Sequence, residues 1–136
     1  MNLIEECFKF QTESITKLNF HILNVICSYL GIVYNCEIFS EMNLLIAANS
    51  PDEWALNICK ALGINEYWNA IGGKTFFDVS KYSANNIDIK FYKQNLSFYS
   101  QRRGKENFIE GLSIIDVMMF NSPEEINRML DAYELI

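Results

Sequence analysis

The chain reads Asn-Glu-Tyr-Trp-Asn-Ala-Ile-Gly-Gly-Lys-Thr-Phe-Phe-Asp-Val at residues 65–79. This stretch places Gly72 and Gly73 beside Lys74 and among aromatic side chains, between an expected helix and an expected strand. An adjacent glycine pair is typical of a turn with positive φ or of a close backbone approach, because glycine loses much backbone entropy on folding. We therefore expect the floor of a pocket here.

Length and composition indicate one soluble globular domain over residues 1–136. The chain has 136 residues, of which 50% are hydrophobic and 14% aromatic, which is enough for one core and excludes a disordered chain. The net charge of −6 disfavours nucleic acid as a partner, since an acidic surface repels phosphates. No apolar run approaches the roughly 20 residues of a membrane span, and residues 1–6 lack the features of a signal peptide. We expect a cytoplasmic location.

The first half of the chain contains two similar helical patterns. Helices are predicted over residues 2–10 and 13–30, followed by a strand over 32–39. Ser50, Pro51 and Glu53 predict a capping box at the start of the next helix. The Leu-Gly-Ile sequence at 30–32 recurs at 62–64, an offset of 32. Two helix-Leu-Gly-Ile-strand units predict an α/β fold with a small, mostly parallel sheet and helices packed on it.

The second half predicts shorter elements. Residues 78–86 are expected to form a short turn or helix, and the alternation at 87–92 predicts a half-buried strand. A polar irregular segment follows at 93–110. Residues 112–121 predict a short buried helix capped by Ser113 and Asp116, with a buried strand as the alternative. A second capping box, Ser122-Pro123-Glu124-Glu125, opens the last helix.

Several groups of residues suggest chemistry. Gly72-Gly73-Lys74-Thr75 is not a P-loop, because Trp68 occupies a required glycine position and Thr75–Val79 has an extended pattern. Anion binding by backbone amides and Lys74 stays open. Arg102, Arg103 and Lys105 form a cluster that can clamp a carboxylate or diphosphate, although a solvated loop is the favoured interpretation.

The remaining candidates favour structural roles. His21 is the only histidine and lies within a helical pattern, so a packed side chain is favoured over catalysis. The four cysteines, Cys7, Cys27, Cys36 and Cys59, have no CxxC spacing. Structural cysteines are therefore favoured over a metal site or disulfides.

Four stretches together resemble the WbqC-like family of bacterial proteins. They are Tyr29–Ile32, Ile58–Gly63, Tyr67–Lys74 and Gly111–Asp116 continuing to Met119-Phe120-Asn121. The Asn-x-Ile-Gly-Gly and Leu-Ser-Ile-Ile-Asp segments are the more specific ones. The family's usual first block, with Gln-Pro-x-x-x-Pro and Asp-Asp segments and an Arg-Asn pair, does not occur. We therefore expect a chain that corresponds to the C-terminal part of a WbqC-like protein.

The resemblance implies a role in cell-surface polysaccharide (O-antigen) biosynthesis, with group transfer on a nucleotide-activated amino sugar as the leading hypothesis. It specifies neither the reaction nor a cofactor, and no metal is expected. Under this hypothesis the substrate-binding residues are Asn69, Gly72, Gly73, Lys74, Tyr99, Gln101, Arg102 and Arg103. The alternative is a non-catalytic binding or accessory domain, or an inactive truncated form, which forms homo-oligomers or pairs with another subunit.

Overall fold

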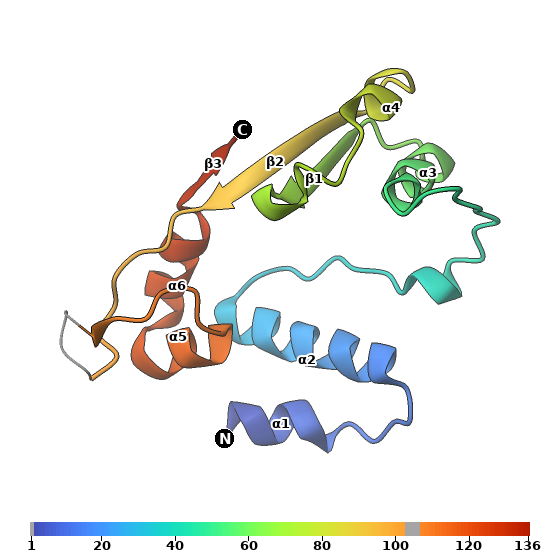
Figure 1. Ribbon diagram of the computed structural model, residues 1–136. Helices are drawn as coiled ribbons and strands as arrows, with labels where there is room; N and C mark the ends of the chain where they lie inside the picture. Colours follow the sequence, from blue (N-terminus) through green and yellow to red (C-terminus); the bar gives the residue numbers. More distant parts are fainter. Residues whose placement is uncertain (1, 103–106) are drawn as a thin grey trace. The chain divides into compact units, whose positions relative to one another are not determined.

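The computed structural model describes residues 2–102 and 107–136, which divide into two compact units (Figure 1). The first unit takes its described residues from 1–42 and 96–131, and the second from 43–95 and 132–136. The expectation of a single domain over residues 1–136 stays a prediction.

Helices make up the first unit. They are α1 (Leu3–Lys9), α2 (Ile15–Leu30), α5 (Ile114–Phe120) and α6 (Pro123–Leu130), with a short 3-10 helix, η1 (Phe39–Glu41). The Asn2 side chain caps α1 by accepting from the backbone N–H of Ile4, and Ser14 caps α2. The amide side chain of Asn127 on α6 donates to the carbonyl of Leu30 at 2.8 Å, which joins α6 to the end of α2.

Local capping signals predicted the last two helices well. Ser122 and Glu125 form the expected capping box, with Pro123 in the first turn of α6. Residues 114–120 are helical, with Ser113 accepting from the N–H of Ile115, so the strand alternative is wrong. The predicted burial of this helix is also wrong, because α5 contains no buried residue.

The second unit is α/β. It contains α3 (Glu53–Leu62), β1 (Glu66–Ala70), the 3-10 helix η2 (Ile71–Gly73), α4 (Val79–Ser83), β2 (Asp88–Gln94) and β3 (Tyr133–Leu135). The central strand β2 pairs in parallel with β1 and antiparallel with β3 (Figure 1). The sheet is therefore mixed, whereas the sequence predicted a mostly parallel one.

The predicted strand at 32–39 is wrong, and so is the idea of a repeated αβ unit. Residues 32–38 form no strand and lead into η1. What the Leu-Gly-Ile repeat encodes is a repeated helix end: Gly31 and Gly63 have φ of 71° and 66°, and the following isoleucine N–H bonds back to Cys27 or Cys59 at 2.8 Å. This is the Schellman arrangement, a local motif that does not require a strand afterwards.

The core of the second unit lies on one face of the sheet. It consists of Leu56, Cys59, Tyr82, Ile87, Ile89 and Phe91, with Tyr67, Ile71 and Phe77 packed against it. Along β2 the side chains alternate between the faces, so Phe91 is 3% exposed and its neighbour Tyr92 is 36% exposed. Within the described residues, no helix has the length and apolar character needed to cross a bilayer.

The alternation along β2 predicts very different costs for two adjacent substitutions. Phe91→Ala should lower the free energy of unfolding by about 3–5 kcal/mol, because it leaves a cavity in the core. Tyr92→Ala, the matched control on the opposite face, should cost about 1 kcal/mol. Urea unfolding followed by circular dichroism measures both values, and equal costs would contradict this assignment of the faces.

Candidate functional site

The Gly-Gly segment lies at the carboxyl end of a parallel strand. Because β1 and β2 are parallel, residues 71–87 must cross from one end of the pair to the other. η2 takes up the first turn of this crossover, directly after Ala70. Ligands of parallel α/β sheets bind outside the carboxyl ends of the strands. Topology therefore supports this segment as a site.

Gly73 allows the close approach that the sequence predicted. The Asn69 side-chain amide donates to the Tyr67 hydroxyl at 2.8 Å. A Cβ placed on Gly73 would lie 2.5 Å from Oδ1 of Asn69, whereas one on Gly72 would meet nothing within 4 Å. Neither glycine has a positive φ. Close packing against the Asn69 carboxamide, and not an unusual backbone conformation, therefore requires glycine at position 73.

The residues after Gly73 form turns, so the predicted extended pattern at Thr75–Val79 is wrong. The N–H groups of Phe76 and Phe77 donate to the Gly73 carbonyl at 2.8 and 3.2 Å. The Lys74 N–H donates to Ile71, and the exposed Lys74 side chain is left to face solvent. A backbone-amide anion site at α4 is not open to a ligand, because Asp78 caps this helix by accepting from the Ser80 N–H at 3.0 Å. Hydrogen bonds from the hydroxyl and from the N–H of Ser80 hold the pKa of the Asp78 carboxyl below its ordinary value.

A charged cluster that the sequence did not predict lies in the same unit. The Lys81 ammonium is 3.0 Å from Glu53 Oε1, 3.2 Å from Asp52 Oδ2 and 3.0 Å from the Ser50 hydroxyl. Asp52 is 7% exposed. The predicted capping box at Ser50 is wrong, because the Ser50 hydroxyl donates to the Asp52 carboxylate at 2.5 Å and α3 begins only at Glu53. The Glu53 carboxylate instead accepts from the Asn49 N–H.

The cluster is built to stay ionised. The pKa of Asp52 is lowered by the Ser50 hydroxyl and then by Lys81, and the pKa of Glu53 is lowered by the Asn49 N–H and then by Lys81. The pKa of Lys81 is raised, chiefly by Glu53. Groups whose pKa values are shifted away from 7 in this way do not exchange protons near pH 7. The cluster therefore joins α4 to the start of α3 and is not an acid–base pair.

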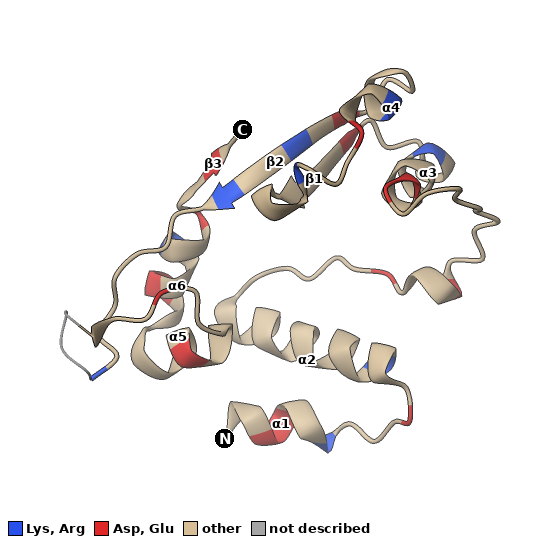
Figure 2. Cartoon of the chain, in the orientation of Figure 1, with Lys and Arg blue, Asp and Glu red and all other residues tan. Residues whose placement is uncertain are grey.

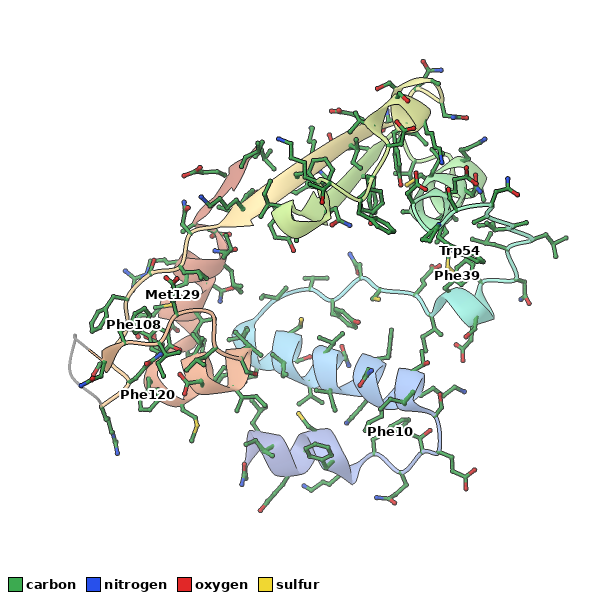
Figure 3. The ribbon with its side chains drawn as sticks, viewed as in Figure 1. Phe10, Phe39, Trp54, Phe108, Phe120 and Met129 are labelled. Atoms are coloured by element: carbon green, nitrogen blue, oxygen red, sulfur yellow. The ribbon has the colours of Figure 1, made fainter. Side chains whose placement is uncertain are left out.

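The other predicted site residues lie in the first unit. The Tyr99 hydroxyl donates to Asp116 Oδ2 at 2.6 Å, and its ring contacts Phe108 and Phe120 at centroid distances of 5.4 and 6.5 Å (Figure 3). Asp116 is thus not the predicted helix cap, because its carboxylate accepts from Tyr99. Burial, and then Asp116, raises the pKa of Tyr99.

Gln101 and Arg102 have contrasting environments. Gln101 is 7% exposed, and its side chain donates to the Ile109 carbonyl at 2.7 Å and accepts from the Ile109 N–H at 3.0 Å. Arg102 is exposed, with a φ of 57°. Arg103 and Lys105 lie outside the described residues. The predicted site thus has Asn69, Gly72, Gly73 and Lys74 in one unit and Tyr99, Gln101 and Arg102 in the other; that they bind one substrate stays a prediction.

No metal centre emerges from the part of the chain that the structure describes. Residues 2–102 and 107–136 contain no group of three His, Cys, Asp or Glu side chains arranged to hold a metal ion. All four cysteines are free thiols, of which Cys7 and Cys59 are buried. Cys59 packs in the core of the second unit as a small hydrophobic residue, as predicted.

The tight contact at Gly73 predicts a difference between the two glycines. Gly73→Ala should push the Asn69 carboxamide out of its hydrogen bond with Tyr67 and lower the free energy of unfolding by about 1–3 kcal/mol. Gly72→Ala, the matched control, should be neutral or stabilising by up to about 1 kcal/mol. Thermal unfolding measures the stability, and the NMR signal of the Asn69 side-chain NH₂ reports the displacement. Two variants with the same stability would refute the role given to Gly73.

The Lys81 cluster predicts a pH-dependent contribution to stability. Lys81→Gln should lower the unfolding midpoint near neutral pH, because Asp52 and Glu53 lose their cation. The loss should shrink as the pH falls through the folded pKa values, which lie below the ordinary 3.8 of Asp52 and 4.5 of Glu53. It should shrink again above the ordinary Lys81 value of 10.5, as the raised folded pKa is passed. A loss that is constant from pH 3 to pH 11, or one equal to that of exposed Lys60→Gln, would argue against this cluster.

Most of the chain is similar to one known protein family. The model of the WbqC-like protein family matches residues 1–128, which is most of the chain. No curated protein and no solved structure matches it. The match does not support the expectation that this chain is only a C-terminal portion of the family pattern. Because the match covers most of the chain, the chain belongs to the WbqC-like protein family.

Proposed function

We propose that this protein takes part in bacterial cell-surface polysaccharide (O-antigen) biosynthesis, where it binds a nucleotide-activated amino sugar for group transfer. The proposal places it in the cytoplasm. Membership of the WbqC-like family supports the pathway. The substrate class is supported by what the Gly-Gly segment offers, which is a carboxamide held by Tyr67 and the exposed side chain of Lys74.

The Asn69 carboxamide is the observation that carries the proposal. It is held by the Tyr67 hydroxyl at 2.8 Å and packs against Gly73, at the carboxyl end of β1. A carboxamide has both donors and an acceptor, which suits sugar hydroxyl or acetamido groups. Because it is held in place before the ligand arrives, little conformational entropy is lost on binding. In this proposal Asn69 orients the sugar and Lys74 meets the diphosphate.

We also propose a role in binding for the segment from Tyr99 to Arg103. The Tyr99–Asp116 and Gln101–Ile109 hydrogen bonds fix the chain on the N-terminal side of the arginine pair. Arginine binds phosphate oxygens through its planar fork of N–H groups. We propose that Arg102 and Arg103 approach the diphosphate. Tyr99 or Gln101 contacts the sugar, and both residues position this segment.

A second candidate is a non-catalytic binding or accessory domain, which forms homo-oligomers or pairs with another subunit. The observation in its favour is the face of the sheet opposite the core, where Trp68, Tyr92 and Tyr133 are 40, 36 and 41% exposed. Trp68 and Tyr92 contact Tyr133 edge-on, at centroid distances of 5.8 and 6.5 Å. Exposed aromatic groups of this kind are enriched at protein interfaces.

Ligand-induced stabilisation separates these two candidates. A nucleotide-activated amino sugar at 100 times its dissociation constant should stabilise the protein by about 2.7 kcal/mol. Lys74→Ala should abolish most of the shift in unfolding temperature, whereas Lys60→Ala, an exposed lysine on α3, should keep it. An equal shift in both variants would remove Lys74 from the site. No shift with any nucleotide sugar, from a folded sample, would favour the accessory domain.

A further inference from the structure

One face of α2 lines a hollow that the proposed function does not use. Phe20 and His21 each lie three or four residues from Lys17 and from Asn24, so the four residues share a face of this helix. The hollow has a volume of about 340 Å³, and its other lining residues are Phe10, Ile38 and Glu41. Small-molecule sites in proteins range upward from roughly 300 Å³. The hollow is therefore large enough for a small metabolite.

His21 forms a fixed part of the lining. Its Nε2 lies 3.3 Å from the backbone carbonyl oxygen of Glu6, and its ring stacks on Phe10 with centroids 4.8 Å apart and an interplanar angle of 22°. Figure 3 shows Phe10 beside the first turns of α2. Since a carbonyl can only accept, Nε2 is the donor in this contact. His21 is thus a packed residue, as the sequence predicted, and it also fixes Phe10.

The charges around the hollow are one cation and one anion. Lys17 is the only Lys, Arg, Asp or Glu within α2, visible as the blue segment in its first turn (Figure 2). Its ammonium lies 3.3 Å from Glu41 Oε1, and the two side chains are 54 and 56% exposed. An ion pair this exposed contributes little to stability. A ligand can therefore separate the two charges at little cost to the fold.

The combination of opposite charges with apolar walls selects a ligand class. A purely anionic ligand would be repelled by Glu41, and a purely cationic one would be repelled by Lys17. A zwitterion complements both charges, and Phe10, Phe20 and Ile38 can cover an apolar group beside it. We propose that this hollow binds a small zwitterion, namely a free α-amino acid with an apolar side chain. Its carboxylate meets Lys17, its ammonium meets Glu41, and its side chain packs on the phenyl rings.

A second hollow adjoins the first. It has a volume of about 440 Å³ and shares Phe20, Ile38 and Glu41 with the first. Cys36, Glu37 and Met42 complete its lining. The two hollows are therefore neighbours on the same unit. This inference does not depend on the proposed binding of nucleotide sugars, because it concerns different residues in the first unit.

Titration calorimetry on the full chain tests the proposal with three related probes. L-Phenylalanine carries both charges, N-acetyl-L-phenylalanine lacks the cation, and L-phenylalaninamide lacks the carboxylate. L-Phenylalanine should bind, and each derivative should bind at least about tenfold more weakly, as expected for the loss of one charge-assisted contact. Absence of L-phenylalanine binding, or equal affinity for all three probes, would overturn the proposal.

Charge-removing variants assign each end of the ligand. Lys17→Gln should reduce the affinity for L-phenylalanine about tenfold and remove the preference over the amide. Glu41→Gln should remove the preference over the N-acetyl derivative. Lys9→Gln is the control, since Lys9 pairs with Glu6 on α1 and does not line the hollow. Circular dichroism shows that the variants are folded. An unchanged preference in either lining variant, or an equal effect of Lys9→Gln, would contradict the assignment.

Discussion

The buried phenol of Tyr82 is the interaction on which the α/β unit depends. Tyr82 is fully buried, and its hydroxyl donates to the carbonyl of Asp52 at 2.9 Å. Its ring lies 6.0 Å from that of Tyr67 on β1 and 5.9 Å from that of Phe77 in the crossover. One residue of α4 thus contacts the start of α3, the first strand and the crossover itself. A parallel strand pair needs such an anchor, because its two strands have no tight turn to join them.

This anchoring explains the geometry of the candidate site. The crossover is held by Tyr82 and by the partly buried ion pairs of Lys81 with Asp52 and Glu53. The chain between β1 and α4 must therefore turn within η2 and the residues after it. Gly73 lies where this turn comes back against Asn69, and an added Cβ there would meet the Asn69 oxygen. Gly73 and Asn69 are thus linked by a single steric requirement, which Gly72 does not share.

Features that depend on neighbouring residues could be predicted from the sequence, and those that depend on distant ones could not. The capping box at Ser122 and the helix ends marked by the Leu-Gly-Ile repeat are local, and the sequence predicted them. Strand identity depends on a partner: Glu66–Ala70 is a strand because it pairs with β2, whereas residues 32–38 form no strand despite a suitable composition.

The candidate site follows the same division. The close approach at Gly73 is encoded within a few residues, and the sequence predicted it as one of two alternatives. The ion pairs of Lys81 join residues 28 and 29 positions apart, and Tyr99 meets Asp116 from 17 positions away. No spacing rule for a single element finds such pairs. Local capping rules misassigned Ser50, Glu53 and Asp116: Ser50 donates to Asp52, Glu53 accepts from Asn49 and Lys81, and Asp116 accepts from Tyr99.

An amide-resolved NMR titration with UDP-N-acetylglucosamine tests the central claim, that the Gly-Gly crossover is a binding surface, most directly. The account predicts shifts of the backbone signals of residues 69–74 and of the Asn69 side-chain NH₂. The signals of the buried strand residues Ile89 and Phe91 should stay largely unchanged. Saturable shifts that leave residues 69–74 unaffected, or a spectrum unchanged by the ligand, would contradict it.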